Sequence, residues 1–80
     1  MLRETVNFPQ AKRPYILVPI PEFKKQIVIA CAIKGQAKVL WTKVQSDIYT
    51  KQIIQIDKVK YMCRFEHNKI KEIHLLEETK

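Results

Sequence analysis

Lysine and aromatic side chains are the residues of this sequence whose types and spacing could do chemistry. Between Lys12 and Lys43 the chain carries seven cations and a single acid, Glu22. The aromatic residues interleaved with these cations are Tyr15, Phe23 and Trp41. Phosphate neutralisation by cations, combined with base stacking on aromatic rings, is how small β-barrels hold single-stranded nucleic acid. The candidate ligands in this stretch are Lys24, Lys25, Lys34, Lys38 and Lys43, with Trp41 or Tyr49 as the stacking ring.

The positive charge is carried mostly by lysine. The net charge is +7, with 12 lysines against 3 arginines. It is concentrated in the first half of the chain, with +5 for residues 1–40 and +2 for residues 41–80. Lysine is a flexible point charge that suits phosphate, whereas arginine is the usual reader of guanine edges. The balance favours contact with the phosphate backbone and little base specificity; the alternative is that abundant Lys and Ile merely reflect AT-rich coding DNA.

A second candidate surface surrounds Met62. Lys60, Met62 and Arg64 alternate with apolar residues, so we expect them to share one exposed face of a strand. An exposed Met between two cations would contact a nucleic acid or a protein; the alternative is an ordinary solvated face. Trp41 also has an alternative role, because it is in phase with Val39 and would then anchor the core.

Residues for metal binding or catalysis do not form a usable pattern. A zinc site would use Cys63, His67 and His74, with Cys31 as a fourth ligand, but their spacing is C-x3-H followed by x6-H. Structural zinc sites pair their ligands as C-x2-4-C or H-x3-5-H, and a catalytic thiol needs an exposed electropositive position. Cys63 lies instead in an apolar alternating run. We therefore predict no catalytic residue, no metal, no cofactor and no enzyme activity.

The cysteines and the apolar runs predict a soluble cytoplasmic protein without a membrane segment. Cys31 and Cys63 both lie in apolar runs, where a reduced cysteine behaves as a small hydrophobe. The first seven residues contain no apolar stretch of signal-peptide length. The longest apolar run, Ile27–Ile33, has seven residues and is far too short to span a bilayer.

Length and composition predict one small domain over residues 1–80. Residues 1–14 are interrupted by Pro9 and Pro14 and are interpreted as a lead-in segment, and residues 77–80 as a frayed charged tail. The fold class predicted is mainly β with little helix, about five short strands forming either a twisted antiparallel sheet or an open barrel of the SH3 or OB kind.

Alternation of apolar and polar residues locates most of the strands. Val59, Tyr61, Cys63 and Phe65 alternate with polar neighbours, which is typical of a half-buried antiparallel strand. A turn at residues 67–69 and a return strand through Ile73 and Leu75 complete a hairpin. Because the apolar phase changes at residues 57–58, we expect a bulge or tight turn there. The other predicted strands are 15–18, 38–44 and 52–56, with Val39 and Trp41 on one face of the second.

The segment Pro21–Lys34 fits two structures. Pro21 at the start and Gly35 after the end are helix punctuation. The β-branched run at residues 27–29 favours a strand, which we prefer, with residues 34–37 as its hairpin connection. Such a strand would be apolar on its second side as well, at Val28, Ala30 and Ala32. That side would need cover from the N-terminal segment or from a second copy in a homodimer.

These observations favour a small basic binding domain over an enzyme. The first hypothesis is binding of nucleic acid through the phosphate backbone. The second is a protein–protein interaction module, such as a phage- or plasmid-encoded regulator or inhibitor, docking on the acidic surface of a larger host protein.

Overall fold

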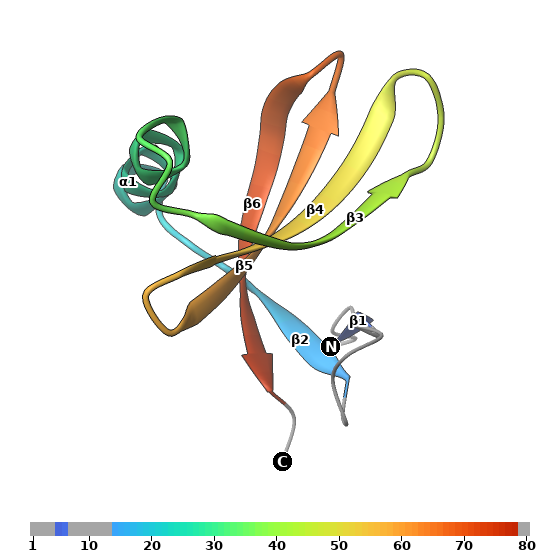
Figure 1. Ribbon diagram of the computed structural model, residues 1–80. Helices are drawn as coiled ribbons and strands as arrows, with labels where there is room; N and C mark the ends of the chain where they lie inside the picture. The colour runs from blue at the N-terminus through green and yellow to red at the C-terminus, as the bar shows by residue number, and fades with distance from the viewer. Residues whose placement is uncertain (1–4, 7–13, 79–80) are drawn as a thin grey trace.

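The computed structural model describes residues 5–6 and 14–78, which form one open antiparallel sheet and one helix (Figure 1). The elements in chain order are β1 Thr5–Val6, β2 Tyr15–Pro19, α1 Glu22–Ile33, β3 Lys38–Val44, β4 Tyr49–Ile56, β5 Val59–Glu66 and β6 Lys69–Glu78. The order across the sheet is β1-β2-β6-β5-β4-β3, and the sheet does not close into a barrel. The prediction of a small mainly β domain is confirmed.

The four C-terminal strands form a meander whose two tight turns depend on residues in the left-handed region. Asp57, at the turn between β4 and β5, has φ 56°. His67 and Asn68, at the turn between β5 and β6, have φ 52° and 66°. The β5–β6 turn, with positive φ at both central residues, is a type I′ turn, whose twist matches that of the flanking strands. The turn expected at residues 57–58 and the hairpin expected after it are both confirmed.

Residues 22–33 form the helix α1, so the preferred prediction of a strand over Pro21–Lys34 is wrong. Pro21 is the N-cap with extended backbone, and its carbonyl accepts a hydrogen bond from the backbone N–H of Lys25 at 3.1 Å. The β-branched residues weaken helix propensity only slightly, because the scale for ordinary residues spans less than about 1 kcal/mol per residue. Packing of Val28, 1% exposed, against the sheet outweighs that preference.

Gly35 ends α1 and does not serve a hairpin, which corrects the expectation for residues 34–37. The backbone N–H of Gln36 donates to the Cys31 carbonyl at 2.9 Å, and that of Gly35 donates to the Ala32 carbonyl at 3.1 Å. These two bonds, with Gly35 at φ 76°, form a Schellman motif. The positive φ expected of Gly35 is therefore present, but it turns the chain from α1 into β3.

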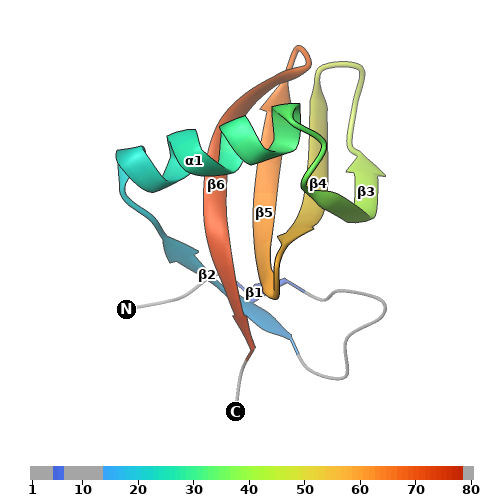
Figure 2. The same ribbon diagram turned by 60° about the vertical axis from the view of Figure 1, so that its left-hand side comes forward.

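The sheet has two faces that differ in what covers them. We call the side on which α1 lies the helix face (Figure 2). Its buried core is Val28, Ile54, Tyr61, Cys63 and Ile73. We call the other side the open face. Its buried cluster is Ile53, Met62 and Leu76, with Tyr15, Leu17, Leu40 and Trp41 packed against it. Met62 is 4% exposed, so the expectation of an exposed Met between two cations is wrong.

A bulge in β3 changes the faces on which its side chains lie. Val39 pairs with Ile54 and Trp41 pairs with Ile53, with the register shift between them. Ile53 and Ile54 are adjacent and point to opposite faces, so Val39 and Trp41 do too. The prediction that Val39 and Trp41 share a face is therefore wrong. The bulge directs Trp41 to the open face and leaves Val39 53% exposed on the helix face.

The two ends of the chain are described only in part. Within the predicted lead-in, residues 5–6 pair with β2 and the other residues up to 13 lie outside the described part. At the predicted tail, Glu77 and Glu78 pair with Ile16 and Tyr15, and residues 79–80 lie outside the described part.

The turn between β5 and β6 generates a prediction about stability. Asn68→Gly is expected to raise the free energy of unfolding by about 0.5–1 kcal/mol, because glycine adopts positive φ without the steric cost that a side chain carries. Urea unfolding of the variant and the parent measures the difference. Lys69→Gly, one residue into β6, is the control and is expected to destabilise. A lower stability for Asn68→Gly would contradict the turn assignment.

Candidate functional site

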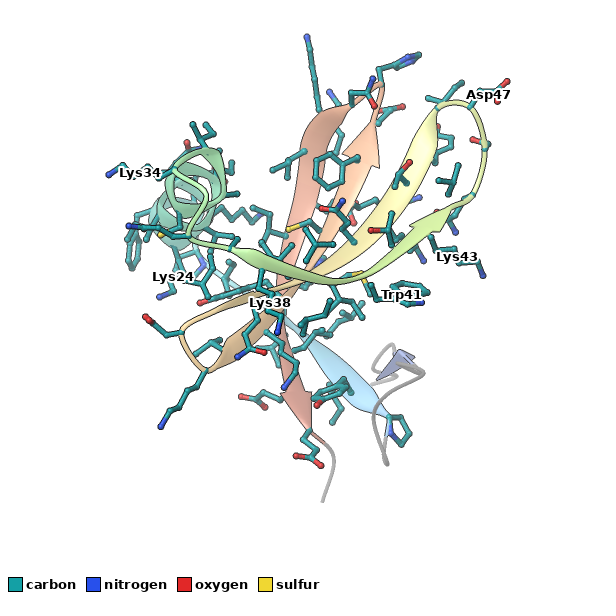
Figure 3. All side chains as sticks on the ribbon, viewed as in Figure 1. Lys24, Lys34, Lys38, Trp41, Lys43 and Asp47 are labelled. Carbon is teal, nitrogen blue, oxygen red and sulfur yellow. The ribbon has the colours of Figure 1, made fainter. Side chains whose placement is uncertain are left out.

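The eight residues selected from the sequence lie on two opposite sides of the sheet. Lys24, Lys25 and Lys34 belong to α1 and its C-cap, on the helix face. The other five belong to β3 and β5: Lys38, Trp41, Lys43, Lys60 and Arg64. Residues directly opposite one another in an antiparallel pair share a face, and the register places all five on the open face. Figure 3 shows Trp41 and Lys43 on the side of the sheet away from Lys24 and Lys34.

A row of three cations crosses three neighbouring strands on the open face. Lys43 of β3 pairs with Lys51 of β4, and Lys51 pairs with Arg64 of β5. Neighbouring strands lie about 4.8 Å apart, so the row spans about 10 Å. We call Lys43, Lys51 and Arg64 the cation row. Lys51 was not selected from the sequence, although its alternation with Ile53 along β4 would have placed it on this face.

The cation row is incompletely neutralised. Arg64 Nη1 lies 3.6 Å from Glu72 Oε2 on β6, where the row ends. Among the described residues, neither Lys43 nor Lys51 has a carboxylate within salt-bridge distance. Like charges directly opposite each other on a sheet are destabilising. The fold therefore holds two unneutralised ammonium groups side by side, an arrangement that attracts an anion.

Tyr49 lies on the turn side of the cation row and holds Arg64. The Arg64 guanidinium carbon is 5.9 Å from the centroid of the Tyr49 ring, which is cation–π distance. The Tyr49 hydroxyl donates to Glu66 Oε1 at 3.3 Å. The Tyr49 side chain is 38% exposed. Arg64 is thus oriented by Glu72 and Tyr49 together, and part of the Tyr49 ring faces solvent beside it.

Trp41 lies on the other side of the cation row and is part of the core. It pairs with Ile53, which pairs with Met62, so an apolar row runs parallel to the cation row. Trp41 is half-buried and packs against the buried cluster of the open face. The interpretation of Trp41 as a core anchor is therefore confirmed, although through Ile53 and not in phase with Val39. Tyr49 is the more accessible ring for stacking.

Lys38 and Lys60 lie further along the open face, and Lys60 reaches β2. Lys38 pairs with Gln55, and Gln55 pairs with Lys60. The Lys60 ammonium is 5.7 Å from the centroid of the Tyr15 ring. A shallow hollow of about 280 Å³ lies here, lined by Tyr15, Lys58, Val59, Lys60, Leu76 and Glu78. The carboxylate of Glu78 in this lining makes the hollow less suited to phosphate than the cation row.

The lysines of α1 do not converge with the cation row. Lys24 is half-buried, and Lys25 Nζ lies 4.0 Å from Glu22 Oε2. Lys34 is exposed at the C-cap, where a cation complements the helix dipole. The described basic residues of the first half of the chain are therefore split between two sides of the sheet.

The two cysteines are free, and they differ in burial. Cys63 is 1% exposed, and burial raises the pKa of its thiol to about 11. Cys31 is half-buried on α1. Within residues 5–6 and 14–78, no group of three or more His, Cys, Asp or Glu side chains is placed to hold a metal ion. In the same residues, no helix combines the length and the apolar character that crossing a membrane requires.

The like charges of the cation row predict an effect on stability. Lys51→Gln is expected to raise the free energy of unfolding at low salt by about 0.2–1 kcal/mol, because it removes two like-charge contacts. The gain should shrink at high salt, where these repulsions are screened. Urea unfolding at two ionic strengths measures both effects. Lys58→Gln removes the same charge in an exposed turn and is expected to change little; an equal gain there would count against the row.

The difference in burial predicts the reactivity of the two thiols. A maleimide at neutral pH is expected to modify Cys31 first and Cys63 only after unfolding, because the reactive species is the thiolate and burial keeps Cys63 protonated. Mass spectrometry of peptides locates the label. In Cys31→Ser, labelling of the folded protein should fall to the slow rate of Cys63. Fast labelling of folded Cys31→Ser would contradict the burial of Cys63.

Comparisons of this chain with protein-family models, with curated proteins and with solved structures found no match.

Proposed function

We propose that this protein binds nucleic acid through its phosphate backbone, and that the cation row is the binding site. The observation that carries the proposal is the pairing of Lys43, Lys51 and Arg64 across three strands, where the carboxylates of the described residues neutralise Arg64 alone. A polyanion placed along the row would neutralise the two free ammonium groups and release its own counterions. Counterion release is the main source of affinity in such contacts.

The chemistry of the cation row favours a single strand without base specificity. Two of the three cations are lysines, which bind phosphate as point charges. Arg64 already engages Glu72 and Tyr49, so its guanidinium is oriented by the protein and not free to read a base edge. The partly exposed ring of Tyr49 would stack an unpaired base beside the phosphates. In a duplex the bases are already stacked and do not reach such a ring.

We propose a non-catalytic role in the cytoplasm, in keeping with two free cysteines that form no disulfide. An acidic protein surface is the alternative partner, because carboxylates would also neutralise Lys43 and Lys51. Competition between an oligonucleotide and poly-glutamate of equal charge separates these two partners.

The test is binding of a fluorescent mixed-sequence single-stranded oligonucleotide, followed by anisotropy over a salt series. Log K against log salt is expected to fall with a slope of about −1.4, because two phosphates are neutralised and each contributes about −0.7 on a single strand. Lys51→Gln should weaken binding and make the slope shallower by about 0.7. Lys34→Gln is the matched control, since it removes one charge on the far side of the sheet and should leave the slope unchanged.

Three results would overturn the proposal. The first is the absence of binding at low salt, and the second is binding that is independent of salt. The third is an equal loss of affinity for Lys34→Gln and Lys51→Gln, which would indicate a general charge effect and not a site at the cation row. Competition by poly-glutamate as strong as that by an oligonucleotide of equal charge would indicate an acidic protein partner.

A further inference from the structure

The strand β3 forms one edge of the sheet. In the part of the chain that the structure describes, β3 pairs with β4 alone, and Figure 2 shows it at the margin of the sheet. β3 has seven residues, whereas β1 at the opposite edge has two. The outer side of an edge strand presents a row of backbone N–H and C=O groups that an added strand can pair with. We call the side of β3 away from β4 the β3 edge.

The outward backbone groups of the β3 edge belong to Thr42 and Val44. The N–H of Gln45 donates to the Tyr49 carbonyl at 2.9 Å. The next pair along the ladder is Val44 with Thr50. Hydrogen-bonded and non-hydrogen-bonded pairs alternate along an antiparallel ladder, so the backbone groups of Val44 and Thr42 do not bond to β4. They point to the β3 edge instead, at the spacing of two residues by which antiparallel strands exchange hydrogen bonds.

The side chains beyond the bulge of β3 are exposed on both faces of the sheet. Val44 is 71% exposed on the helix face, and Thr42, also exposed, shares that face. Lys43 lies between them on the open face. Thr50, opposite Val44 on β4, is half-buried and has a strand on either side. Because β-branched side chains pack well against cross-strand neighbours, a further strand beside β3 would cover Val44 and Thr42 in the same way.

We propose that the β3 edge binds an extended acidic segment of another protein, which adds to the sheet as an antiparallel strand. The two partner residues opposite Thr42 and Val44 are β-branched and exchange backbone hydrogen bonds with them. The partner residue between those two lies opposite Lys43 on the open face and is Asp or Glu. In this recognition mode the backbone bonds give affinity and the alternate side chains give specificity. The inference goes beyond the proposed nucleic-acid site and does not depend on it.

Lys43 determines the charge of the partner. Its ammonium is not within salt-bridge distance of any carboxylate of residues 5–6 and 14–78. Residues directly opposite each other on neighbouring strands have Cβ atoms about 5 Å apart, so a partner carboxylate would reach this ammonium. The net charge of +7 favours the approach of an acidic segment at longer range. A lysine or arginine of the partner at the same position would be repelled.

The same lysine disfavours a second copy of this chain at the β3 edge. Two β3 strands that bond through both Thr42 and Val44 must place Val44 of each copy opposite Thr42 of the other. That register sets Lys43 opposite Lys43, and like charges in this position are destabilising. The bulge between Val39 and Trp41 interrupts the edge on its other side. Lysines and bulges of this kind protect sheet edges from pairing with one another, yet an acidic strand meets no repulsion beyond the bulge.

The first test is titration of the isotope-labelled full chain with a blocked eight-residue peptide in which valine alternates with glutamate. The NMR shifts of the backbone amides are expected to change most at Thr42 and Val44, and hydrogen exchange of these amides should slow. The expected dissociation constant lies below about 1 mM. A peptide of the same length with lysine in place of glutamate is the matched control. It should bind about five- to tenfold more weakly, because repulsion by Lys43 replaces attraction.

The second test identifies the backbone bonds without changing the protein. Methylation of the backbone nitrogens of the peptide valines removes the donors that face Thr42 and Val44. Binding is then expected to fall tenfold or more. Methylation of the glutamate nitrogens is the matched control and should leave most of the affinity, because alternate N–H groups of a strand point to opposite sides.

The third test reverses the charge at the β3 edge. Lys43→Glu should weaken binding of the glutamate peptide by about two- to fivefold and strengthen binding of the lysine peptide by a similar factor. Lys43 is exposed, so the substitution leaves the core intact. Lys34→Glu makes the same change of charge at the C-cap of α1 and should have a much smaller effect on either peptide. Circular dichroism of both variants confirms that they are folded.

Several outcomes would overturn the inference. The first is no binding of the glutamate peptide at about 1 mM. Others are equal losses for the two methylated peptides, shifts centred on a strand other than β3, and equal effects of Lys34→Glu and Lys43→Glu. Self-association of the chain that shifts the same amides of β3 would make a second copy the occupant.

The β3 edge and the cation row can fail independently. Failure of oligonucleotide binding would bear on the cation row, and failure of peptide binding would bear on the β3 edge. Lys51→Gln separates the two surfaces, because it removes the central charge of the cation row. Lys51 lies two strand spacings, about 10 Å, from an added strand, so the substitution should change peptide affinity by less than about twofold. An equal loss for peptide and oligonucleotide would place the peptide on the cation row and overturn the assignment to the β3 edge.

Discussion

The antiparallel register between β4 and β5 is the constraint on which the rest of the structure depends. It pairs eight residues of each strand without a bulge, from Tyr49 opposite Glu66 to Ile56 opposite Val59. Ile53 and Ile54 are 0% and 3% exposed on opposite faces, so both faces of β4 carry core. A slip of one residue would exchange the faces of every side chain on the strand. This one register therefore determines where the helix-face core, the open-face cluster and the cation row lie. The turn at Asp57 fixes the register.

Alternation in the sequence predicted this meander well, because the period of two is a local property that tertiary contacts reinforce. The same reasoning failed for α1. Its β-branched residues favour a strand locally, while the chain needs a crossover from β2 to the far edge of the sheet. A 12-residue helix laid over the helix face supplies that connection and buries Val28. The preference for a strand was small per residue, and burial against the sheet outweighed it. The bulge at Leu40 could not be predicted from the sequence either, because no Gly or Pro lies there.

The candidate site shows why composition along the chain is a poor guide to a surface on a sheet. The four cations of the first half of the sequence that the structure describes divide between α1 with its C-cap and β3, on opposite sides of the sheet. The cation row takes one residue from each of three strands, and its central member, Lys51, lies outside the lysine-rich stretch. To predict the cation row, one must know which side chains of each strand lie on the open face and how the strands pair. The faces could be predicted from alternation for β5, and the pairings followed only from the structure.

The exposed apolar side of α1 and the cation row both lower the free energy of unfolding, but for different physical reasons. On α1 the side chains of Phe23, Ile27 and Ile33 are exposed to water, which forgoes the stabilisation that their burial would supply. The cation row sets like charges opposite each other, which lowers stability directly. Both are departures from a sequence optimised for folding alone, and such departures are expected where a sequence serves a function. A partner that binds only the folded chain and covers either surface would return stability by mass action. In a small domain the buried fraction of surface is low, so such a partner would add a substantial part of the free energy of unfolding.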